Sequence, residues 1–278
     1  MLAYPVSTKP IDYSKPVFIQ PKLDGVRCVI QYEPLRNRVV AYSRTGKEWK
    51  NIDHILKELK TFFAKHPNVI LDGELYNHDL KDDFEKIISL VRKTKPTDEH
   101  KLESKEMVEF HCYDIIDEEL PFEQRIEFVT ESLMLLGDSI HTVDTRLTLD
   151  DHDAKLTHGI NLANGYEGSI VRTNDTYACK RSHNLRKFKD FSDAEAYIVG
   201  YEEGKGKRAG HLGKFIMQDE DGNKFGCPPG KGYNYKDMKD MLENIHEYMG
   251  QTATFTYFER TKAGSYRHPL FKAIRNYE

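Results

Sequence analysis

The pattern of the sequence changes near residue 191, and this change limits the folds that the chain can adopt. Before it, strand-like runs of β-branched and aromatic residues alternate with longer segments that space their apolar residues as helices do. After it, short strand-like runs follow one another between glycine-rich turns, and only "YKDMKDMLENIHEYM" is helical in pattern. A chain of 278 residues can hold two cores. We expect an α+β domain over residues 1–191 and a small β-barrel of the oligonucleotide-binding kind over residues 192–278.

The first domain is expected to combine antiparallel strands with helices. The runs "PVFIQPK", "VRCVIQY" and "RVVAYS" suggest a three-stranded antiparallel meander. Residues 52–66 predict one amphipathic helix with Asp53 as a possible cap, and residues 82–93, 121–137 and about 150–163 predict three more. "NVILDGELY", "VEFHCYDII" and "EGSIVRT" are predicted strands.

Composition excludes several classes of protein. Charged residues make up 31% of the chain, and no apolar run approaches the eighteen or so residues that a membrane span needs. The N-terminus lacks the basic and apolar regions of a signal peptide. The four cysteines are far apart and form no CxxC pair. We expect a cytoplasmic protein with reduced cysteines and no membrane partner.

Charge is unevenly distributed along the chain. The formal net charge of -4 argues weakly against a nucleic-acid partner. Acids gather in residues 72–131, however, whereas "CKRSHNLRKFK" carries five cations and no acid, and "GKGKRAGHLGK" follows closely. The distribution therefore keeps a phosphate-rich partner open.

Lys22, in "QPKLDGVRC", is the candidate nucleophile. A lysine becomes nucleophilic only after it loses a proton, which requires burial or nearby positive charge. Lys187 and Lys189 in "KFK" supply such charge, since on a strand both would project to one face while Phe188 packs behind. The alternatives are an exposed lysine beside an Asp-Gly turn and a half-exposed strand at "KFK".

Carboxylates in two further segments could act beside these lysines. "LDGELY" places Asp72 and Glu74 on one side of a strand, and Glu167 precedes a glycine in "YEGSIVR". Such groups can hold divalent cations or hydrogen-bond ribose hydroxyls. A turn at Asp72 and a solvated loop at Glu167 are the alternatives.

The order of six short motifs resembles that of the ATP-dependent DNA ligases. They are "KLDGVR", "SRTG", "LDGEL", "FHCYDI", "EGSIVR" and "LRKFK", similar to motifs I, Ia, III, IIIa, IV and V of that family. The family belongs to the covalent nucleotidyltransferases, with RNA ligases and mRNA-capping enzymes. "FKDFSDAEAYIVGYEEGKGKRAGHLGKF" and "GSYRHPLFKAIR" extend the resemblance over nearly the whole chain. It implies an adenylation domain of antiparallel sheets flanked by helices (1–191), followed by an OB-fold β-barrel (192–278).

The resemblance implies a nucleotide site around Lys22. Lys22 would be the lysine that becomes covalently adenylylated, with Lys187 and Lys189 as catalytic contacts to phosphate. Tyr113 would stack on adenine and Glu74 would bind ribose. The full set of nucleotide-binding residues that it implies is Gln20, Arg27, Glu74, Tyr113, Lys187 and Lys189. At the position of Gln20 many relatives carry an acid near the adenine amino group.

A metal site and a pyrophosphate contact follow from the same resemblance. Glu167 and Glu74 would hold Mg²⁺, for which Mn²⁺ could substitute. The segment "RHPLFKAIRNYE" is similar to the opening of motif VI and contributes Arg267 and Arg275. The implied cofactors are thus ATP and Mg²⁺.

Two arginines are implied contacts to DNA. Arg44, in "SRTG", matches the family arginine that engages the 5′-phosphate at a nick, and Arg181 would be a further nick-phosphate contact, with Arg186 as its alternative. Only 21 residues precede Lys22, so we expect no separate N-terminal DNA-binding domain. The two catalytic domains would then hold the DNA themselves.

The resemblance implies an ATP-dependent DNA ligase that seals 5′-phosphate/3′-hydroxyl nicks through lysyl-AMP and adenylylated DNA. Its partner would be nicked double-stranded DNA, and we expect a monomer serving replication or repair, located in the host cytoplasm if it comes from a bacteriophage. An RNA ligase, a capping guanylyltransferase and a non-catalytic OB-type nucleic-acid-binding protein are the alternatives.

Overall fold

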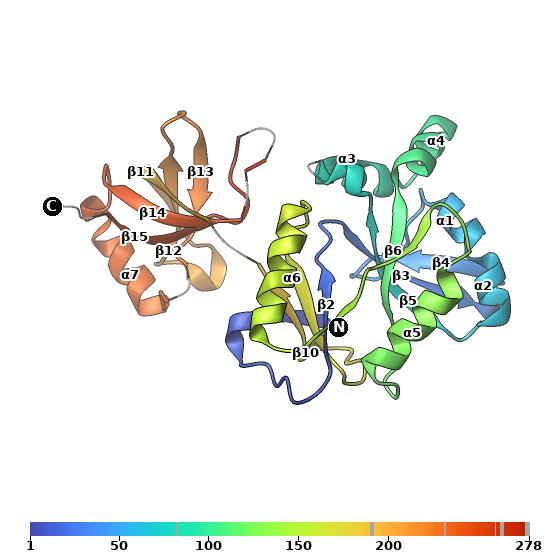
Figure 1. Ribbon diagram of the computed structural model, residues 1–278. Coiled ribbons are helices and arrows are strands. Elements are labelled where there is room, and N and C mark those ends of the chain that lie inside the picture. The colour runs from blue at the N-terminus through green and yellow to red at the C-terminus, as the bar shows by residue number, and fades with distance from the viewer. Residues whose placement is uncertain (82, 190–191, 231, 259, 262–263, 276–278) are drawn as a thin grey trace. The chain divides into compact units, whose positions relative to one another are not determined.

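The computed structural model divides the chain into two compact units, Met1–Lys189 and Asp190–Glu278 (Figure 1). It describes all residues except 82, 190–191, 231, 259, 262–263 and 276–278. The predicted domain boundary at residue 191 thus lies outside the described residues. The α+β class predicted from the sequence is confirmed, because antiparallel sheets and helices occur in both units.

The first unit contains two five-stranded sheets, A and B. Sheet A contains the strand that ends just before Lys22 in "QPK" and the strand that ends just before Lys189 in "KFK". Its strand order is β1-β10-β9-β2-β8, and every neighbouring pair is antiparallel except β1 with β10. Helix α6 (Asp151–Ala163) lies against β2 and β8. The strands are β1 (Leu2–Pro5), β2 (Val17–Pro21), β8 (Arg146–Thr148), β9 (Ser169–Thr173) and β10 (Arg181–Phe188).

Sheet B has the strand order β4-β3-β5-β6-β7, with only β6 and β7 parallel. Its strands are β3 (Val26–Glu33), β4 (Arg38–Tyr42), β5 (Ile70–Tyr76), β6 (Glu109–Ile115) and β7 (Ile140–Thr142). The predicted three-stranded meander is wrong, since β2 pairs in sheet A and only β3 and β4 form a hairpin. Residues 22–25 therefore carry the chain from one sheet to the other.

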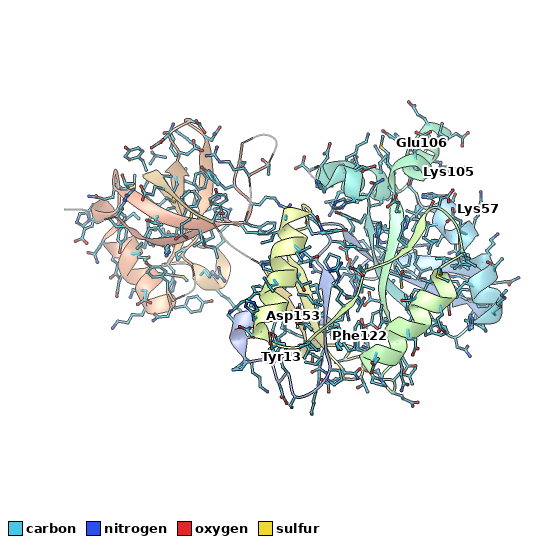
Figure 2. All side chains as sticks on the ribbon, viewed as in Figure 1. Tyr13, Lys57, Lys105, Glu106, Phe122 and Asp153 are labelled. Atoms are coloured by element: carbon cyan, nitrogen blue, oxygen red, sulfur yellow. The ribbon has the colours of Figure 1, made fainter. Side chains whose placement is uncertain are left out.

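Helices form the main core with one face of sheet B. The helices are α1 (Asp53–Glu58), α2 (Lys60–Lys65), α3 (Phe84–Val91), α4 (Asp98–Met107) and α5 (Phe122–Leu133). Helix α5 lies against β6 and β7 and α1 against β4, while α3 and α4 pack on each other. Phe63 and Phe122 are buried there with Ile30 and Leu75 of the sheet. Phe122 is fully buried, whereas Lys57 of α1 is exposed; both are labelled in Figure 2. The opposite face of sheet B remains for the polar residues described below.

One helix prediction needs correction, and one helix was not predicted. The single helix expected over residues 52–66 is two helices, α1 and α2, joined at Leu59, and the residue before α1 is Ile52 while Asp53 lies in its first turn. Helix α4 was not expected, because its mostly charged sequence "DEHKLESKEM" has no clear apolar stripe.

The second unit contains sheet C and helix α7 (Tyr235–Glu243), which packs on β12. The strands are β11 (Ser192–Glu203), β12 (Leu212–Gln218), β13 (Lys224–Cys227), β14 (Thr252–Tyr257) and β15 (Leu270–Ile274), antiparallel in the order β13-β12-β11-β14-β15. The prediction of successive strands with one α-helix, in "YKDMKDMLENIHEYM", is confirmed for the described residues of this unit. Among the described residues no ladder closes the sheet into a barrel, but an isolated bridge joins Pro229, beyond β13, to Phe271 of β15.

Two expectations about the whole chain are tested directly. All four cysteines are free, as predicted. Among the residues that the structure describes, no helix combines the length and the apolar character that crossing a bilayer requires.

Candidate active site

The ends of three strands of sheet A bring together residues that are far apart in the sequence. Pro21 at the end of β2 is the partner of Ser169, which in turn is the partner of Phe188 on β10. Beyond these pairs, the amide of Lys22 donates to the carbonyl of Gly168 (2.9 Å), and the amide of Glu167 donates to the carbonyl of Lys22 (3.2 Å). The register alone thus places Lys22, Glu167 and the residue after Phe188 side by side.

Glu167 joins the two lysines through its side chain. One carboxylate oxygen accepts from Nζ of Lys22 and the other accepts from Nζ of Lys189. The Glu167 side chain is only 5% exposed, compared with 22% for Lys22. Lys187 is half-buried near the end of β10, and Lys189 directly follows the last residue of that strand, Phe188. The alternative of a solvated loop at Glu167 is wrong, because this carboxylate is buried between cations.

Gly168 makes this approach possible. Its φ is +143°, and an added Cβ would lie 2.3 Å from the carbonyl oxygen of Phe188. A side chain at this position would therefore push β10 away from the start of β9. The glycine after Glu167 keeps Lys189 within reach of the carboxylate.

A cavity of about 120 Å³ opens beside Lys22. Its lining includes four residues that the sequence assigned to nucleotide binding or catalysis, together with the unpredicted Ile170 and Arg172. The four are Gln20, Lys22, Glu74 and Tyr113. The cavity therefore receives residues from both sheet A and sheet B.

Glu74 reaches the cavity from the middle of β5. The "LDGELY" segment is a strand through Asp72 and Gly73, so the alternative of a turn there is wrong. Burial raises the pKa of Glu74 to about 8, an effect that the nearby charge of Lys22 opposes. Gly25 packs directly against Glu74, since a Cβ at Gly25 would be 2.4 Å from the carbonyl oxygen of Leu75 and 2.7 Å from Cγ of Glu74.

Arg27 of β3 is held by Asp72 of β5, which lies two residues before Glu74, the Cα partner of Arg27. Nε and Nη2 of Arg27 donate to the two Asp72 oxygens at 2.8 and 3.0 Å, and Nη2 also donates to the hydroxyl of Tyr177 at 2.9 Å. The Tyr177 hydroxyl donates to Asp72 at 2.6 Å, and that of Tyr113 donates to the same carboxylate at 3.3 Å. Asp72 thus fixes the position of Arg27 and holds the hydroxyl group of Tyr113, whose side chain lines the cavity.

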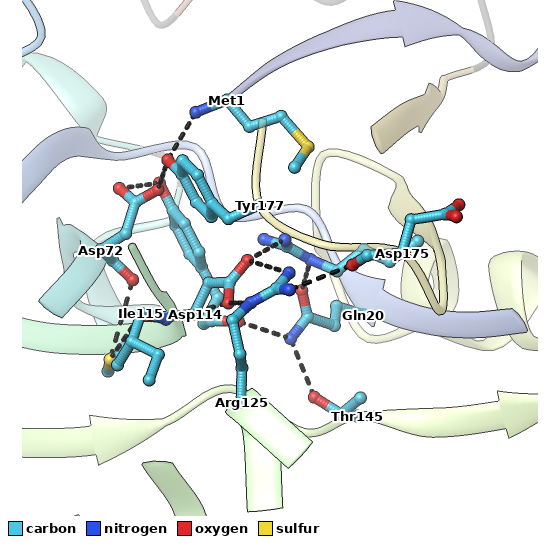
Figure 3. A network of polar contacts seen from close by, with 12 residues as sticks. Met1, Gln20, Asp72, Asp114, Ile115, Arg125, Thr145, Asp175 and Tyr177 are labelled. Atoms are coloured by element: carbon cyan, nitrogen blue, oxygen red, sulfur yellow. Dashed lines mark hydrogen bonds and ion pairs between the residues drawn. The ribbon is translucent and has the colours of Figure 1, made fainter. Parts of the chain in front are cut away.

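A buried polar network supports the base of the cavity (Figure 3). The Asp114 carboxylate accepts from Arg125 (2.7 and 3.2 Å) and from Nη1 of Arg172 (2.7 Å). Nε of Arg172 donates to the side-chain oxygen of Gln20 at 2.6 Å. The Gln20 amide nitrogen donates to the hydroxyl oxygen of Thr145 at 2.8 Å and to the carbonyl of Tyr113 at 3.2 Å. Every polar atom of the Gln20 side chain is therefore engaged.

Sequence reasoning missed Arg125 and Arg172, although both carried a signal. Each arginine lies among apolar residues of its helix or strand, at a position where a buried side chain is expected. In the structure Arg125 is 1% exposed and Arg172 is 4% exposed. A buried arginine requires an anion nearby. The sequence held too many candidate acids for Asp114 to be identified as that anion.

A groove of about 810 Å³ begins at Arg27 and Glu74 and contains Arg44. Arg44 is exposed in the turn of residues 43–47, where the amide of Ser43 donates to the carbonyl of Lys47. Six cationic side chains line the groove against the carboxylates of Glu48 and Glu74. The cations are Arg27, Arg44, Lys47, Lys50, Arg92 and Lys93.

The two arginines that competed for a role in "CKRSHNLRKFK" differ in environment. Arg186 is 5% exposed and donates to the carbonyls of His183 (2.8 Å) and Lys9 (2.5 Å). It fixes the backbone and is not available to a phosphate. Arg181 is exposed, donates to the carbonyl of Ala3 (2.7 Å) and lies over the ring of Tyr4.

The motif VI-like arginines lie in the second unit. Arg267 lies over the ring of Phe258 at 5.9 Å, and Arg275 forms an ion pair with Glu195. Both positions are near the ends of sheet C.

Comparison with known proteins links both units to one family. Residues 1–189 match the family described as "ATP dependent DNA ligase domain", and residues 203–275 match the "DNA ligase OB-like domain". A DNA ligase of African swine fever virus is 31% identical in an alignment 204 residues long, which covers 70% of this chain and 46% of the relative. That of Enterobacteria phage T4 is 25% identical in an alignment that covers 85% of this chain and 58% of the relative.

Solved structures share the fold over nearly the whole chain. One described as "DNA binding with a minimal scaffold: Structure-function analysis of Lig E DNA ligases" has a TM-score of 0.79 at 22% identity, and covers 99% of this chain and 98% of its own. An ATP-dependent DNA ligase from bacteriophage T7 in complex with ATP has a TM-score of 0.59 at 20% identity, with coverages of 99% and 97%. The chain spans about half the length of the first curated relatives that it matches.

Proposed function

The chain belongs to the ATP-dependent DNA ligase family, and we propose that it seals 5′-phosphate/3′-hydroxyl nicks in duplex DNA with ATP as the nucleotide. The observation that carries this proposal is that Lys22, which lines the cavity with Glu74 and Tyr113, is joined through Glu167 to Lys189. A buried carboxylate between two lysines, next to a cavity, is an arrangement suited to phosphate chemistry.

In the first step, Nζ of Lys22 attacks the α-phosphorus of ATP. The N–P bond forms as the bond to pyrophosphate breaks, and the product is a lysyl-AMP phosphoramidate. Glu167 accepts a hydrogen bond from Nζ of Lys22, so it holds the nucleophile and can receive one of its protons. Lys189, on the other oxygen of the carboxylate, and Lys187 offset the charge that develops on phosphate.

The cavity walls recognise the nucleoside. Tyr113 offers an aromatic face for the base, and Glu74 offers a carboxyl group for ribose hydroxyls. Both hydrogens of the Gln20 amide are used by Thr145 and Tyr113, and its oxygen accepts from Arg172, so only the second lone pair of that oxygen can meet a base. A hydrogen-bond acceptor at this place favours the amino group of adenine over the carbonyl oxygen of guanine.

The carboxyl groups near Lys22 suit Mg²⁺. Glu167 and Glu74 provide oxygen ligands beside the cavity, and Mg²⁺ is usually bound through one or two carboxylates with substrate phosphates and water. When bound, the ion would lower the electrostatic cost of bringing triphosphate to Lys22. To act as a ligand, Glu167 would share its oxygens between the ion and the two lysines.

The later steps use the cationic groove. The 5′-phosphate of the nick displaces Lys22 from AMP, which forms a pyrophosphate-type bond in the adenylylated DNA and frees the amine. The 3′-hydroxyl then attacks the 5′-phosphorus and AMP leaves. Arg44 binds the 5′-phosphate, since it lies exposed in a groove that reaches Glu74 at the cavity. Arg181, also exposed, is a second candidate for contact with the DNA backbone.

The test is a labelling and sealing assay with Lys22→Ala. The wild-type protein is incubated with ATP radiolabelled at the α-phosphate and Mg²⁺, and then with a singly nicked duplex. Protein label and sealed product are read on denaturing gels. Lys22→Ala should carry no label, whereas Lys57→Ala, on the outer surface of α1, should match the wild type (Figure 2).

Covalent label on Lys22→Ala would contradict the nucleophile assignment. Label from GTP and not ATP would favour a guanylyltransferase, and sealing of nicked RNA alone would favour an RNA ligase. A wild-type protein that binds nicked duplex but takes no label from either nucleotide would contradict catalysis by this chain.

A further inference from the structure

Glu109, His111 and His141 form a cluster of potential metal ligands that the proposed ligase chemistry does not use. Each can offer one ligand atom, and these atoms lie within 4.8 Å of one another. The cluster follows from strand pairing: β6 and β7 are parallel, and His111 is the Cα partner of His141. Glu109 lies two residues before His111 on β6, so it projects to the same face of sheet B.

The spacing of the donor atoms suits one metal ion. Nε2 of His111 lies 2.8 Å from Oε2 of Glu109, and Nε2 of His141 lies 3.6 Å from the same oxygen. In a tetrahedral zinc site with bonds of about 2.0 to 2.1 Å, neighbouring ligand atoms are about 3.3 Å apart. These two distances lie on either side of this value, and the ligand atoms of the two histidines lie within 4.8 Å of each other, so rotation of the imidazoles toward a common point would complete the site.

His141 provides a second observation that points to a ligand. Its Nε2 atom is buried and has no hydrogen-bond partner in the described part of the chain. Buried polar atoms in native proteins are nearly always paired, so this one calls for a partner. The side chain as a whole is 40% exposed, which leaves a path by which an ion can enter.

The chemistry of the donors selects the metal class. Two imidazoles and one carboxylate suit zinc and its neighbours in the first transition series, whereas Mg²⁺ prefers oxygen ligands throughout. Catalytic zinc sites with two histidines and a glutamate leave a fourth position for water. The cluster therefore differs in metal preference from the carboxyl groups near Lys22.

We propose that Glu109, His111 and His141 bind one divalent transition-metal ion of the zinc class. The ion fastens β7, an edge strand of three residues, to β6. It also lies on the face of sheet B that carries Glu74, because His111 is the Cα partner of Glu74 on the other side of β6. The site goes beyond the proposed ligase function and needs none of its steps.

Metal binding is tested on the full chain, freed of any affinity tag and of metal by chelation. Calorimetric titration with Zn²⁺ should give one site per chain, and Co²⁺ should bind with a visible spectrum typical of nitrogen and oxygen ligands. Excess Mg²⁺ should not compete. Zn²⁺ should raise the melting temperature, since it binds the folded state.

Two variants and two controls localise the ion. His141→Ala should weaken Zn²⁺ binding at least about tenfold, because loss of even an outer-shell partner often costs this much, and Glu109→Gln should act in the same direction. His152→Ala removes an exposed histidine of α6, and Cys179→Ser removes the exposed thiol; both should bind as the wild type does.

The proposal is overturned if the wild-type chain binds no Zn²⁺, or if His141→Ala and Glu109→Gln both bind it with unchanged affinity while their circular dichroism is native. Loss of binding in Cys179→Ser alone would overturn it too, since the ion would then be on the thiol. Because the readout is metal binding, failure of the sealing assay would leave this result unaffected.

Discussion

Three carboxyl groups organise the candidate site, and neighbouring charges and burial determine how the charge of each is stabilised. Glu167 is buried between Lys22 and Lys189, so its charge is compensated from both sides. Asp72 is likewise compensated by Arg27. Glu74 is different, because burial raises the pKa of its carboxyl group to about 8. A carboxyl group with this pKa changes its charge near pH 8 and not near pH 4.5, where a carboxyl group in water does.

The stability of the protein should therefore depend on pH through Glu74. Its carboxyl group has an ordinary pKa of 4.5 in the unfolded chain and a pKa of about 8 when folded, so the folded state binds the proton more tightly. The stabilisation is fully present below pH 4.5 and is lost as the pH rises through 8. Glu74→Gln removes this dependence.

Urea unfolding of the wild type and Glu74→Gln at a series of pH values provides the measurement. The difference in unfolding free energy should shift in favour of the variant as pH rises between about 4.5 and 8, and then level off. Parallel curves for the two proteins across this window would show that the pKa of Glu74 is not raised by folding.

At the scale of elements, the connection between β2 and β3 decides the geometry of the site. Residues 22–25 leave sheet A at Lys22 and enter sheet B at Val26. Gly25 makes the entry possible because its Cα lies against the backbone of β5, where a Cβ would meet the carbonyl oxygen of Leu75 at 2.4 Å. The same contact brings the chain of Lys22 next to Glu74.

Gly25→Ala should separate this connection from β5. We expect the unfolding free energy to fall by about 1 to 3 kcal/mol, the usual cost of overpacking, and the rate of lysyl-AMP formation to fall with it because Lys22 moves relative to Glu74. Gly159→Ala is the matched control, since that glycine lies in α6 with no atom within 4 Å of an added Cβ.

The unfolding free energy of the control, Gly159→Ala, should rise by about 0.5 to 1 kcal/mol because alanine has a higher helix propensity than glycine. This variant should form lysyl-AMP at the wild-type rate. Denaturant unfolding and single-turnover labelling with ATP measure the two effects. If Gly25→Ala is as stable and as active as Gly159→Ala, close packing at this connection does not position Lys22.

At the scale of the whole molecule, the distribution of charge matters more than its sum. The chain carries a formal net charge of -4, yet the groove beside the cavity is lined by six cations and two carboxylates. Cations gathered in one groove can bind a phosphate backbone even when the protein as a whole repels it. The proposed DNA contact is therefore local and electrostatic.

Binding of nicked duplex should weaken steeply with salt, and the groove should account for part of the slope. Arg92→Ala with Lys93→Ala removes two groove cations at the end of α3, and should flatten the plot of log affinity against log salt by about one unit for each phosphate that these side chains neutralise. Lys57→Ala with Lys65→Ala removes two exposed charges from α1 and α2 and should keep the wild-type slope.

Fluorescence anisotropy with a labelled nicked duplex, without ATP or Mg²⁺, measures both slopes. A salt response that is flat in the wild type, or changed equally by the two double variants, would contradict the assignment of DNA binding to this groove.

Sequence alone determined the type and order of most elements, because hydrophobic period and turn residues are local properties. The short strands of the second unit and the helix α6 followed from such patterns. Residue types also pointed to Lys22, Glu74, Glu167 and Lys189 as members of one site. The order of motifs indicated the family that the comparisons then identified.

Only the tertiary structure decided which of these elements and side chains meet. The pairing of β2 with β9 in sheet A, in place of a meander with β3, depends on contacts between residues about 150 positions apart. The bonds that Asp114 receives from Arg125 and Arg172, which are 11 and 58 positions away, and the pairing of His111 with His141 also join separate elements. Local pattern carries no information about such long-range partners, since their choice is made by the packing of the whole unit.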